Sequence, residues 1–151
     1  MPDVIIADTS VLIIISKIEA LELLYRMYGE VFITPEVADE YGEPIPSWIS
    51  LKSPKDAKYV SLLQTQVDAG EASAIALACE TSDVLLLLDD LKARKLAAKL
   101  GFRISGTLGV VGKARDRGFI ASVGPYIEKL QDTDFHIASQ LLDVFLKEFN
   151  R

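Results

Sequence analysis

Histidine and cysteine are almost absent from this chain of 151 residues, which contains one of each, His136 and Cys79. Zinc sites built from clusters of these side chains need more ligands than the sequence supplies. A serine or cysteine nucleophile activated by histidine would have to use His136, which is more simply explained as a surface residue at the start of a helix. Cys79 cannot form a disulfide within the chain, and its apolar neighbours 76–78 predict a small core residue.

A long hydrophobic segment is also missing. The longest apolar runs are far too short to cross a bilayer. The N-terminus lacks the basic stretch of a signal peptide and leads directly into a predicted strand. Together with the single cysteine, these absences predict a cytoplasmic protein that has no membrane partner.

The composition that is present is that of a folded protein. Half of the residues are hydrophobic, and the chain has only 9 glycines and 6 prolines, so a disordered chain is excluded. The sequence shows no internal repeat and no linker. A chain of this length can bury a full core, and we expect one domain over residues 1–151.

Charge is distributed unevenly along the chain. Residues 91–117 contain eight basic side chains and one acid, a net charge of +7, so the rest of a chain whose total is −6 carries −13. A basic surface beside an acidic centre could bind phosphates, although solvated helix faces would give the same pattern. The basic residues are Lys92, Arg94, Lys95, Lys99, Arg103, Lys113, Arg115 and Arg117.

Apolar runs alternate with helical patterns along the chain. Val4–Ala7 and Val84–Leu88 are uninterrupted apolar runs, as expected for strands buried on both faces of a parallel sheet. Shorter strands are predicted at Val31–Ile33 and Phe102–Ile104, with an edge strand or loop around Trp48–Leu51. Strands joined by helices predict an α/β fold with right-handed crossovers and helices on both faces of the sheet.

The helix boundaries follow from capping residues and glycine stops. Thr34 and Pro35 resemble a helix start, and Gly70 is expected to separate two helices. The predicted helices cover residues 11–16, 18–28, 35–41, 57–67, 71–80, 91–100, 107–117, 123–130 and 137–149.

Acidic residues follow both long apolar runs. Asp8 ends the first run, and Asp89 and Asp90 end the second, while Glu71 opens a helix and Glu40 lies near the end of another. Ligands of doubly wound sheets gather at the carboxyl ends of the strands, so these carboxylates could meet there. Clustered carboxylates repel each other, and a bound cation is the usual remedy. Carboxylate oxygens favour Mg²⁺ or Mn²⁺.

Each acid also has a purely structural explanation. Asp8 and Asp89 could cap the helices that follow them. Glu71 could favour the dipole of its helix, and Glu40 could be a solvated surface residue. The involvement of two strand ends favours a shared site over four unrelated structural roles.

Five stretches in the same order resemble the PIN-domain nucleases, including the VapC-type toxins of prokaryotic toxin–antitoxin pairs. The likeness is greatest to a small prokaryotic PIN-like branch, and it covers most of the chain. The stretches are IADTSVLI at 6–13, ITPEVADE at 33–40, GEASAIALA at 70–78, LLDDLKAR at 87–94 and GTLGVV at 106–111.

The resemblance implies a parallel sheet of four or five strands and an acidic site that binds Mg²⁺ or Mn²⁺. Asp8, Glu40 and Glu71 match the first three acids of the family, and the fourth is Asp89 or Asp90. The implied metal ligands are Asp8, Glu71, Asp89 and Asp90. The implied supporting residues are Thr9, Ser10 and Thr107.

The implied activity is hydrolysis of RNA phosphodiester bonds by an activated water. Lys92, Arg94, Lys95 and Arg115 are candidate RNA contacts within the basic segment. The toxin branch also implies an antitoxin protein as a partner. Self-association is common among such proteins, so we expect a homodimer, for which Phe145, Leu146 and Phe149 offer an apolar surface; alternatively, these side chains complete the core.

Two other functions compete with the nuclease. A catalytically degenerate PIN-like module would bind RNA or a protein partner without cleaving it. A phosphoacceptor receiver domain also places acids at strand ends, but its pattern needs an acid pair after the first strand, where this chain has only Asp8. The leading hypothesis is therefore a divalent-metal-dependent ribonuclease.

Overall fold

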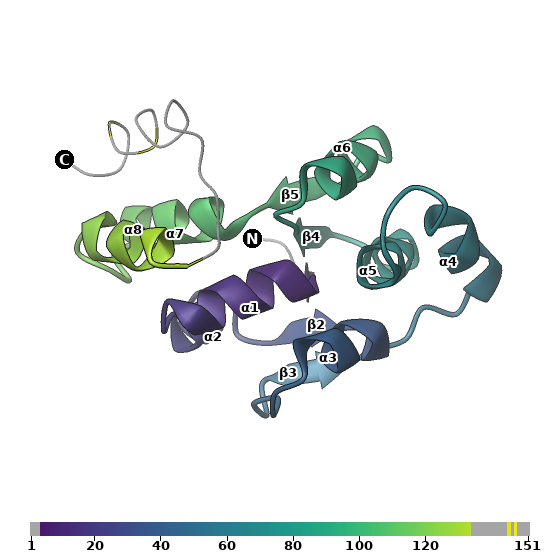
Figure 1. The fold of residues 1–151 in the computed structure, drawn as a ribbon, viewed down its shortest axis with the longest axis horizontal. Coiled ribbons are helices and arrows are strands. Elements are labelled where there is room, and N and C mark those ends of the chain that lie inside the picture. The colour runs from purple at the N-terminus through teal and green to yellow at the C-terminus, as the bar shows by residue number, and fades with distance from the viewer. Residues whose placement is uncertain (1–3, 134–144, 146, 148–151) are drawn as a thin grey trace.

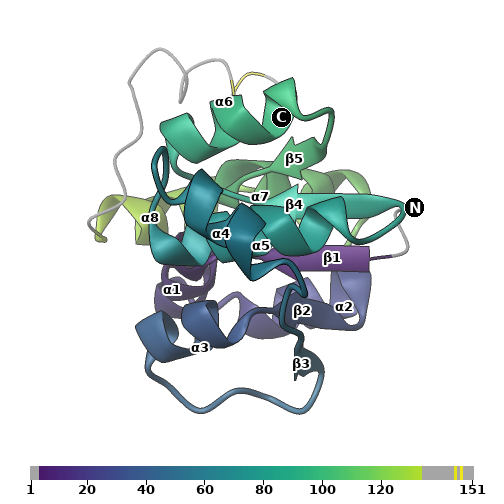
Figure 2. The same cartoon turned by 90° about the vertical axis from the view of Figure 1, so that its right-hand side faces the viewer.

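The strands form one parallel sheet of five, as the sequence predicts. The computed structural model describes residues 4–133 together with Phe145 and Lys147. Figure 2 shows the strands stacked from β5 at the top to β3 at the bottom, with β1 and β4 in the middle. In sheet order they are β3 (Ile49–Leu51), β2 (Val31–Ile33), β1 (Val4–Ala7), β4 (Val84–Leu87) and β5 (Arg103–Ser105).

Helices cover both faces of this sheet. Helices α1, α2, α7 and α8 lie on one side and α4, α5 and α6 on the other (Figure 1), while α3 packs against α1 and α5. The bounds of the helices are α1 Thr9–Lys17, α2 Leu21–Tyr28, α3 Pro35–Tyr41, α4 Ala57–Leu63, α5 Ala69–Cys79, α6 Leu91–Lys99, α7 Thr107–Asp116 and α8 Gly124–Gln131.

The central strand β1 supplies side chains to two separate cores. Ile5 and Ala7 pack in the core beneath α1, α2, α7 and α8, whereas Ile6 packs in the core beneath α4, α5 and α6. Successive side chains of a strand point to opposite faces, so burial of both faces requires apolar residues at every position. This explains the uninterrupted apolar runs in β1 and β4, and it confirms the α/β prediction.

The start of α5 differs from the prediction. The sequence suggested that Gly70 separates two helices and that the second begins at Glu71, but the helix already begins at Ala69. Asp68 is the N-cap, and its side chain and that of Glu71 accept hydrogen bonds from each other's backbone N–H groups. This reciprocal capping box compensates for the low helix propensity of Gly70, which lies within the first turn.

Cys79 is exposed, so its prediction as a core residue was wrong. All residues of α5 from Gly70 to Ala78 are buried, but Cys79 is the last residue of the helix and lies where this burial ends. The Cys79 thiol contacts the Tyr59 hydroxyl at 3.7 Å. Apolar neighbours in the sequence therefore did not indicate the environment of the terminal residue.

Other helices are shorter than predicted. The helix predicted at 18–28 begins at Leu21, because Glu19 has a positive φ of 58° and breaks the helical backbone. The helix predicted at 57–67 ends at Leu63. None of the helices in residues 4–133 is long and apolar enough to cross a membrane.

The last predicted helix, at 137–149, falls largely outside the described residues, as do His136, Leu146 and Phe149. Phe145 is described, and it is buried in the same core as Ile127 and Leu130 of α8. Its position agrees with the alternative in which this side chain completes the core.

Candidate carboxylate site

Asp8 lies at the carboxyl end of β1, in the middle of the sheet. Its backbone N–H donates to the Leu87 carbonyl at 3.0 Å, so the pairing of β1 with β4 extends to this residue. The Asp8 side chain is 2 % exposed and makes no capping hydrogen bond to α1, although Asp8 occupies the N-cap position. Within residues 4–133, Asp8 Oδ1 is buried without a hydrogen-bond partner. Capping alone therefore does not explain this carboxylate.

The electrostatic environment of Asp8 disfavours its charged form. Burial and, to a smaller extent, the negative charges of Glu71, Asp68 and Glu40 together raise the pKa of Asp8 from 3.8 to about 7, while the nearby backbone N–H of Thr9 opposes the rise. Charges influence a pKa in this way when they are close and poorly screened. Acids from α3 and α5 thus converge on the end of β1.

Glu71 has a structural role and also faces this cluster. Its carboxylate accepts a hydrogen bond from the Asp68 backbone N–H at 3.1 Å within the capping box. The side chain is nevertheless buried, and burial together with the charges of Asp68 and Asp90 raises the pKa of Glu71 to about 7, although the Asp68 backbone N–H opposes the rise. A structural role at the start of its helix therefore holds for Glu71 but is incomplete, because a surface glutamate in a capping box would keep a low pKa.

Glu40 approaches the same point from α3. It is an exposed residue, but its Oε1 accepts a hydrogen bond from the Thr9 hydroxyl at 3.1 Å, next to Asp8. The carboxylate also lies against Gly70, where a Cβ atom would collide with Glu40 Oε1 and come within 3.2 Å of the Thr9 hydroxyl. Glu40 is thus not simply a solvated surface residue.

Asp89 and Asp90 have different surroundings. Asp89 accepts hydrogen bonds from the Thr107 backbone N–H at 2.7 Å and from the Thr107 hydroxyl at 2.5 Å. Burial raises the pKa of Asp89, while these hydrogen bonds and the charge of Arg94 oppose the rise. Asp90, rather than Asp89, caps α6 through the Ala93 N–H at 3.0 Å. The charge of Asp90 contributes to the raised pKa of Glu71, so Asp90 is close enough to Glu71 to act on it electrostatically.

The predicted supporting residues and Arg94 are all at least half-buried, and three of these four make side-chain contacts within the protein. Thr9 contacts Glu40, Thr107 is buried against Asp89, and Ser10 is half-buried in the first turn of α1. Arg94 is half-buried, and its guanidinium donates to the Leu88 carbonyl at 2.7 Å. Arg94 therefore serves an internal contact.

The other three candidate RNA contacts are basic residues of α6 and α7. Lys92 and Lys95 are exposed on α6, and Arg115 is half-buried on α7. Of the candidate RNA contacts, the two lysines are thus the most accessible to a phosphate group.

The donors at β1 suit a hard divalent cation. Two buried carboxylates are available, one with an unpartnered oxygen, and Mg²⁺ is often bound by one or two carboxylates together with waters and substrate phosphates. In the part of the chain that the structure describes, no group of three or more His, Cys, Asp or Glu side chains is arranged to hold a metal. These two carboxylates therefore suit an ion that keeps much of its shell of coordinated water.

Sequence reasoning did not associate four nearby residues with the site: Asp68, Gly70, Thr34 and Ser73. The spacing of Asp68 and Glu71 is that of a capping box and would have identified Asp68. The buried contact between Thr34 and Ser73 joins residues 39 positions apart, and no local pattern signals it.

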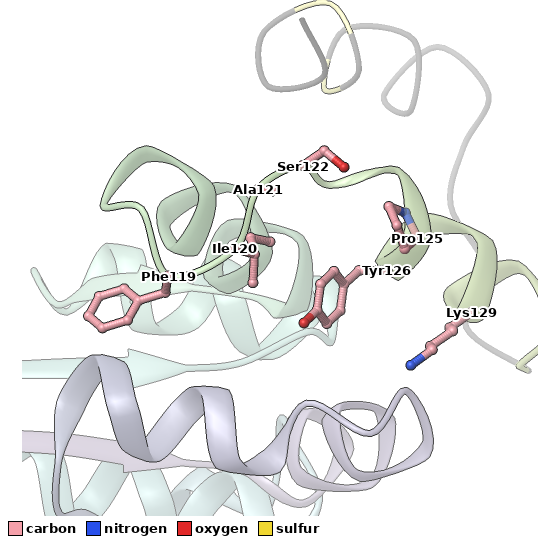
Figure 3. Close-up of a pocket in the computed structure, with 7 residues that line it drawn as sticks. All are labelled: Phe119, Ile120, Ala121, Ser122, Pro125, Tyr126 and Lys129. Atoms are coloured by element: carbon pink, nitrogen blue, oxygen red, sulfur yellow. The ribbon is translucent and has the colours of Figure 1, made fainter.

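A cavity elsewhere in the molecule contains none of these acids. It measures about 370 Å³ and lies beside the turn between α7 and α8, where the side chains of Phe119, Tyr126 and Lys129 face it (Figure 3). Its wall is largely apolar and aromatic. The carboxylates at the end of β1 are therefore separate from this cavity.

The comparison with protein families agrees with the fold. A family model described as PIN domain matches residues 4–151, which is nearly the whole chain. No curated protein matches the chain. PIN domains are generally nucleases and typically use divalent metals. The chain therefore belongs to the PIN-domain family.

Proposed function

We propose that this protein is a divalent-metal-dependent ribonuclease that hydrolyses RNA phosphodiester bonds. The observation that supports this most strongly is the Asp8 carboxylate, which is buried at the end of β1 with an unpartnered oxygen and with Glu71 and Glu40 close enough to raise its pKa. Burying such a group costs free energy unless a cation compensates for it. A bound divalent ion would supply that compensation.

The surroundings of each acidic side chain indicate its role in the proposed site. Asp8 and Glu71 would hold the ion, and Asp90 would add negative charge at the edge of the site. Glu40 keeps its position through the Thr9 hydroxyl. A bound ion of this kind supplies a water of lowered pKa and neutralises charge on the phosphate oxygens.

The basic residues favour a polyanionic substrate. Lys92 and Lys95 are exposed on α6, directly after Asp90. Cations beside an acidic centre attract the phosphate backbone, and their contribution weakens as salt is added. The substrate is thus expected to lie over the start of α6 with a phosphate at the carboxylates.

The test is cleavage of a structured RNA by the purified protein with Mg²⁺ or Mn²⁺ and with EDTA. We expect cleavage only with the metal, and a loss of about 100-fold or more in Asp8→Asn, which removes a charge without changing the shape of the side chain. Asp132→Asn is the matched control, because Asp132 is exposed at the end of α8. Cleavage that persists unchanged in Asp8→Asn would exclude the proposed activity.

A catalytically degenerate module is the second candidate. Two observations favour it: the described residues contain no group of three metal ligands, and Asp89 is already satisfied by Thr107 and lies beside Arg94. Calorimetry with Mn²⁺ distinguishes the two candidates. Heat of binding that disappears in Asp8→Asn supports the nuclease, whereas no binding to the wild-type protein supports the module.

The toxin role, the antitoxin partner and the cytoplasmic location belong to the same proposal. The toxin role and the antitoxin rest on the resemblance to the toxin branch of the family, and the location rests on the single cysteine and the lack of a signal-peptide pattern. Induced expression of the chain in a bacterial host is expected to stop growth, and expression of Asp8→Asn at the same level is not. Equal growth of the two cultures would exclude the toxin role, and the proposed ribonuclease activity would be judged by the cleavage assay alone.

A further inference from the structure

A buried chain of hydroxyl groups joins α3 to α5. Thr34 and Ser73 are fully buried, and their oxygens lie 2.7 Å apart. Thr34 Oγ1 accepts from the Val37 N–H at 3.2 Å, and the Ser73 hydroxyl donates to the Gly70 carbonyl at 2.8 Å. Because the single proton of Ser73 is used for Gly70, Thr34 donates to Ser73. The bonds then run in one direction, and every donor is satisfied.

The same two helices touch again at Glu40. The Glu40 carboxylate lies against the Cα atom of Gly70, in space that any larger residue at this position would fill. Thr34 begins α3 and Glu40 lies near its end, while Ser73 and Gly70 are one turn apart on α5. The position of α3 is thus fixed at both ends by one short segment of α5.

This position determines where the Glu40 carboxylate lies. Its Oε1 reaches the Thr9 hydroxyl at 3.1 Å, and Thr9 is the neighbour of Asp8. A shift of α3 along α5 would move Glu40 away from Thr9, and it would also move the Glu40 carboxylate relative to Asp8.

We propose that Ser73 and Thr34 are positioning residues, which hold α3 on α5 and thereby place the Glu40 carboxylate beside Thr9 and Asp8. Glu40 would act on the ion held by Asp8 and Glu71 through its negative charge beside Asp8; this effect rests on the proposed function, but the positioning itself does not. Buried hydroxyls are costly in an apolar core, where alanine or valine would fill the same space. A fully satisfied polar chain instead specifies one arrangement of the helices that share it.

The experiment compares two substitutions. Ser73→Ala removes the bond between the helices and leaves the capping of α3 by Thr34 intact. Thr34→Ser is the matched control, because it keeps the hydroxyl and every hydrogen bond and loses only a methyl group. We expect Ser73→Ala to weaken Mn²⁺ binding about 10-fold by calorimetry, and Thr34→Ser to change it less than 3-fold.

A double-mutant cycle tests whether the effect passes through Glu40. In a Glu40→Gln background, Ser73→Ala is expected to leave the remaining Mn²⁺ affinity unchanged. An equal loss of affinity in both backgrounds would overturn the proposal, because Ser73 would then act independently of Glu40. No loss in either background would overturn it as well.

Two further measurements keep the test decisive. If Ser73→Ala does not fold, Gly70→Ala displaces Glu40 from the opposite end of the contact, and the same loss of Mn²⁺ affinity is expected. If the wild-type protein binds no Mn²⁺, the proposed function fails, and urea unfolding of Ser73→Ala, Thr9→Val and the double variant tests the positioning in the metal-free protein. The positioning would be refuted if the urea-midpoint shifts of Ser73→Ala and Thr9→Val added up to the shift of the double variant, because the two residues would then act independently.

Discussion

The charge of Asp8 should make the metal-free protein less stable at high pH. A carboxyl group whose pKa is raised on folding keeps its proton in the native state after the unfolded chain has lost it. The contribution of Asp8 to stability is therefore greatest below the ordinary pKa of 3.8, falls as the pH rises towards the native value of about 7, and is lowest above it. Glu71 contributes in the same direction, because its pKa is also raised to about 7.

Asp8→Asn removes one of these charges while it preserves the shape of the side chain. The difference between 3.8 and about 7 corresponds to an upper limit of roughly 4 kcal/mol at pH 8. Water entry and small movements reduce such costs, so we expect a gain of about 2 kcal/mol at pH 8. For a chain of this length that gain raises the Tm by roughly 4–8 °C. At pH 5, where Asp8 is largely protonated in the folded protein, most of the gain should disappear.

The assay is thermal unfolding in EDTA at pH 5 and pH 8, followed by unfolding at pH 8 with Mn²⁺. A metal at 100 times its Kd stabilises the wild-type protein by about 2.7 kcal/mol, and Asp8→Asn should lose most of this effect. Asp132→Asn controls for the loss of an exposed charge. If Asp8→Asn is less stable than the wild type at pH 8 in EDTA, Asp8 is not an uncompensated buried anion and the reasoning is refuted.

Three further predictions concern other parts of the structure. Gly106→Ala would place a Cβ atom 2.6 Å from Asp89 Oδ1 and 2.9 Å from Arg94 Nη1, and urea unfolding should show a loss of about 1–3 kcal/mol; no loss would mean that this contact is loose. Asp68→Ala removes the N-cap of α5 and should cost about 1 kcal/mol in the same assay, unless another group replaces the cap. The homodimer predicts a mass near twice 16.6 kDa by light scattering at micromolar concentration, and a mass of one chain would exclude it.

The strands and the positions of the acids were predictable because their signals are local. The apolar runs at β1 and β4 have few explanations other than strands buried on both faces, and the acids that follow them must emerge at one edge of a parallel sheet. Thr34 and Pro35 also predicted the start of α3 correctly.

The details that failed depend on contacts between distant segments. Gly70 resembled a helix break because glycine is a weak helix former, but here its small size accommodates Glu40 from another helix. The sequence also left Asp89 and Asp90 undistinguished, because the hydrogen bonds that set Asp89 apart come from Thr107, 18 residues away. Cys79 resembled a core residue because burial at the end of a helix depends on neighbours that a local pattern does not contain.

The place of β1 in the sheet has a consequence during synthesis on the ribosome. β1 is made first, but it pairs with β2 on one side and with Val84–Leu87 on the other. Until those residues emerge, one edge of an apolar strand lacks its partner, and such an edge can pair with another nascent chain. Aggregation of incomplete chains is therefore the characteristic hazard of this topology, and chaperones that bind the first 80 or so residues would be expected to improve the yield.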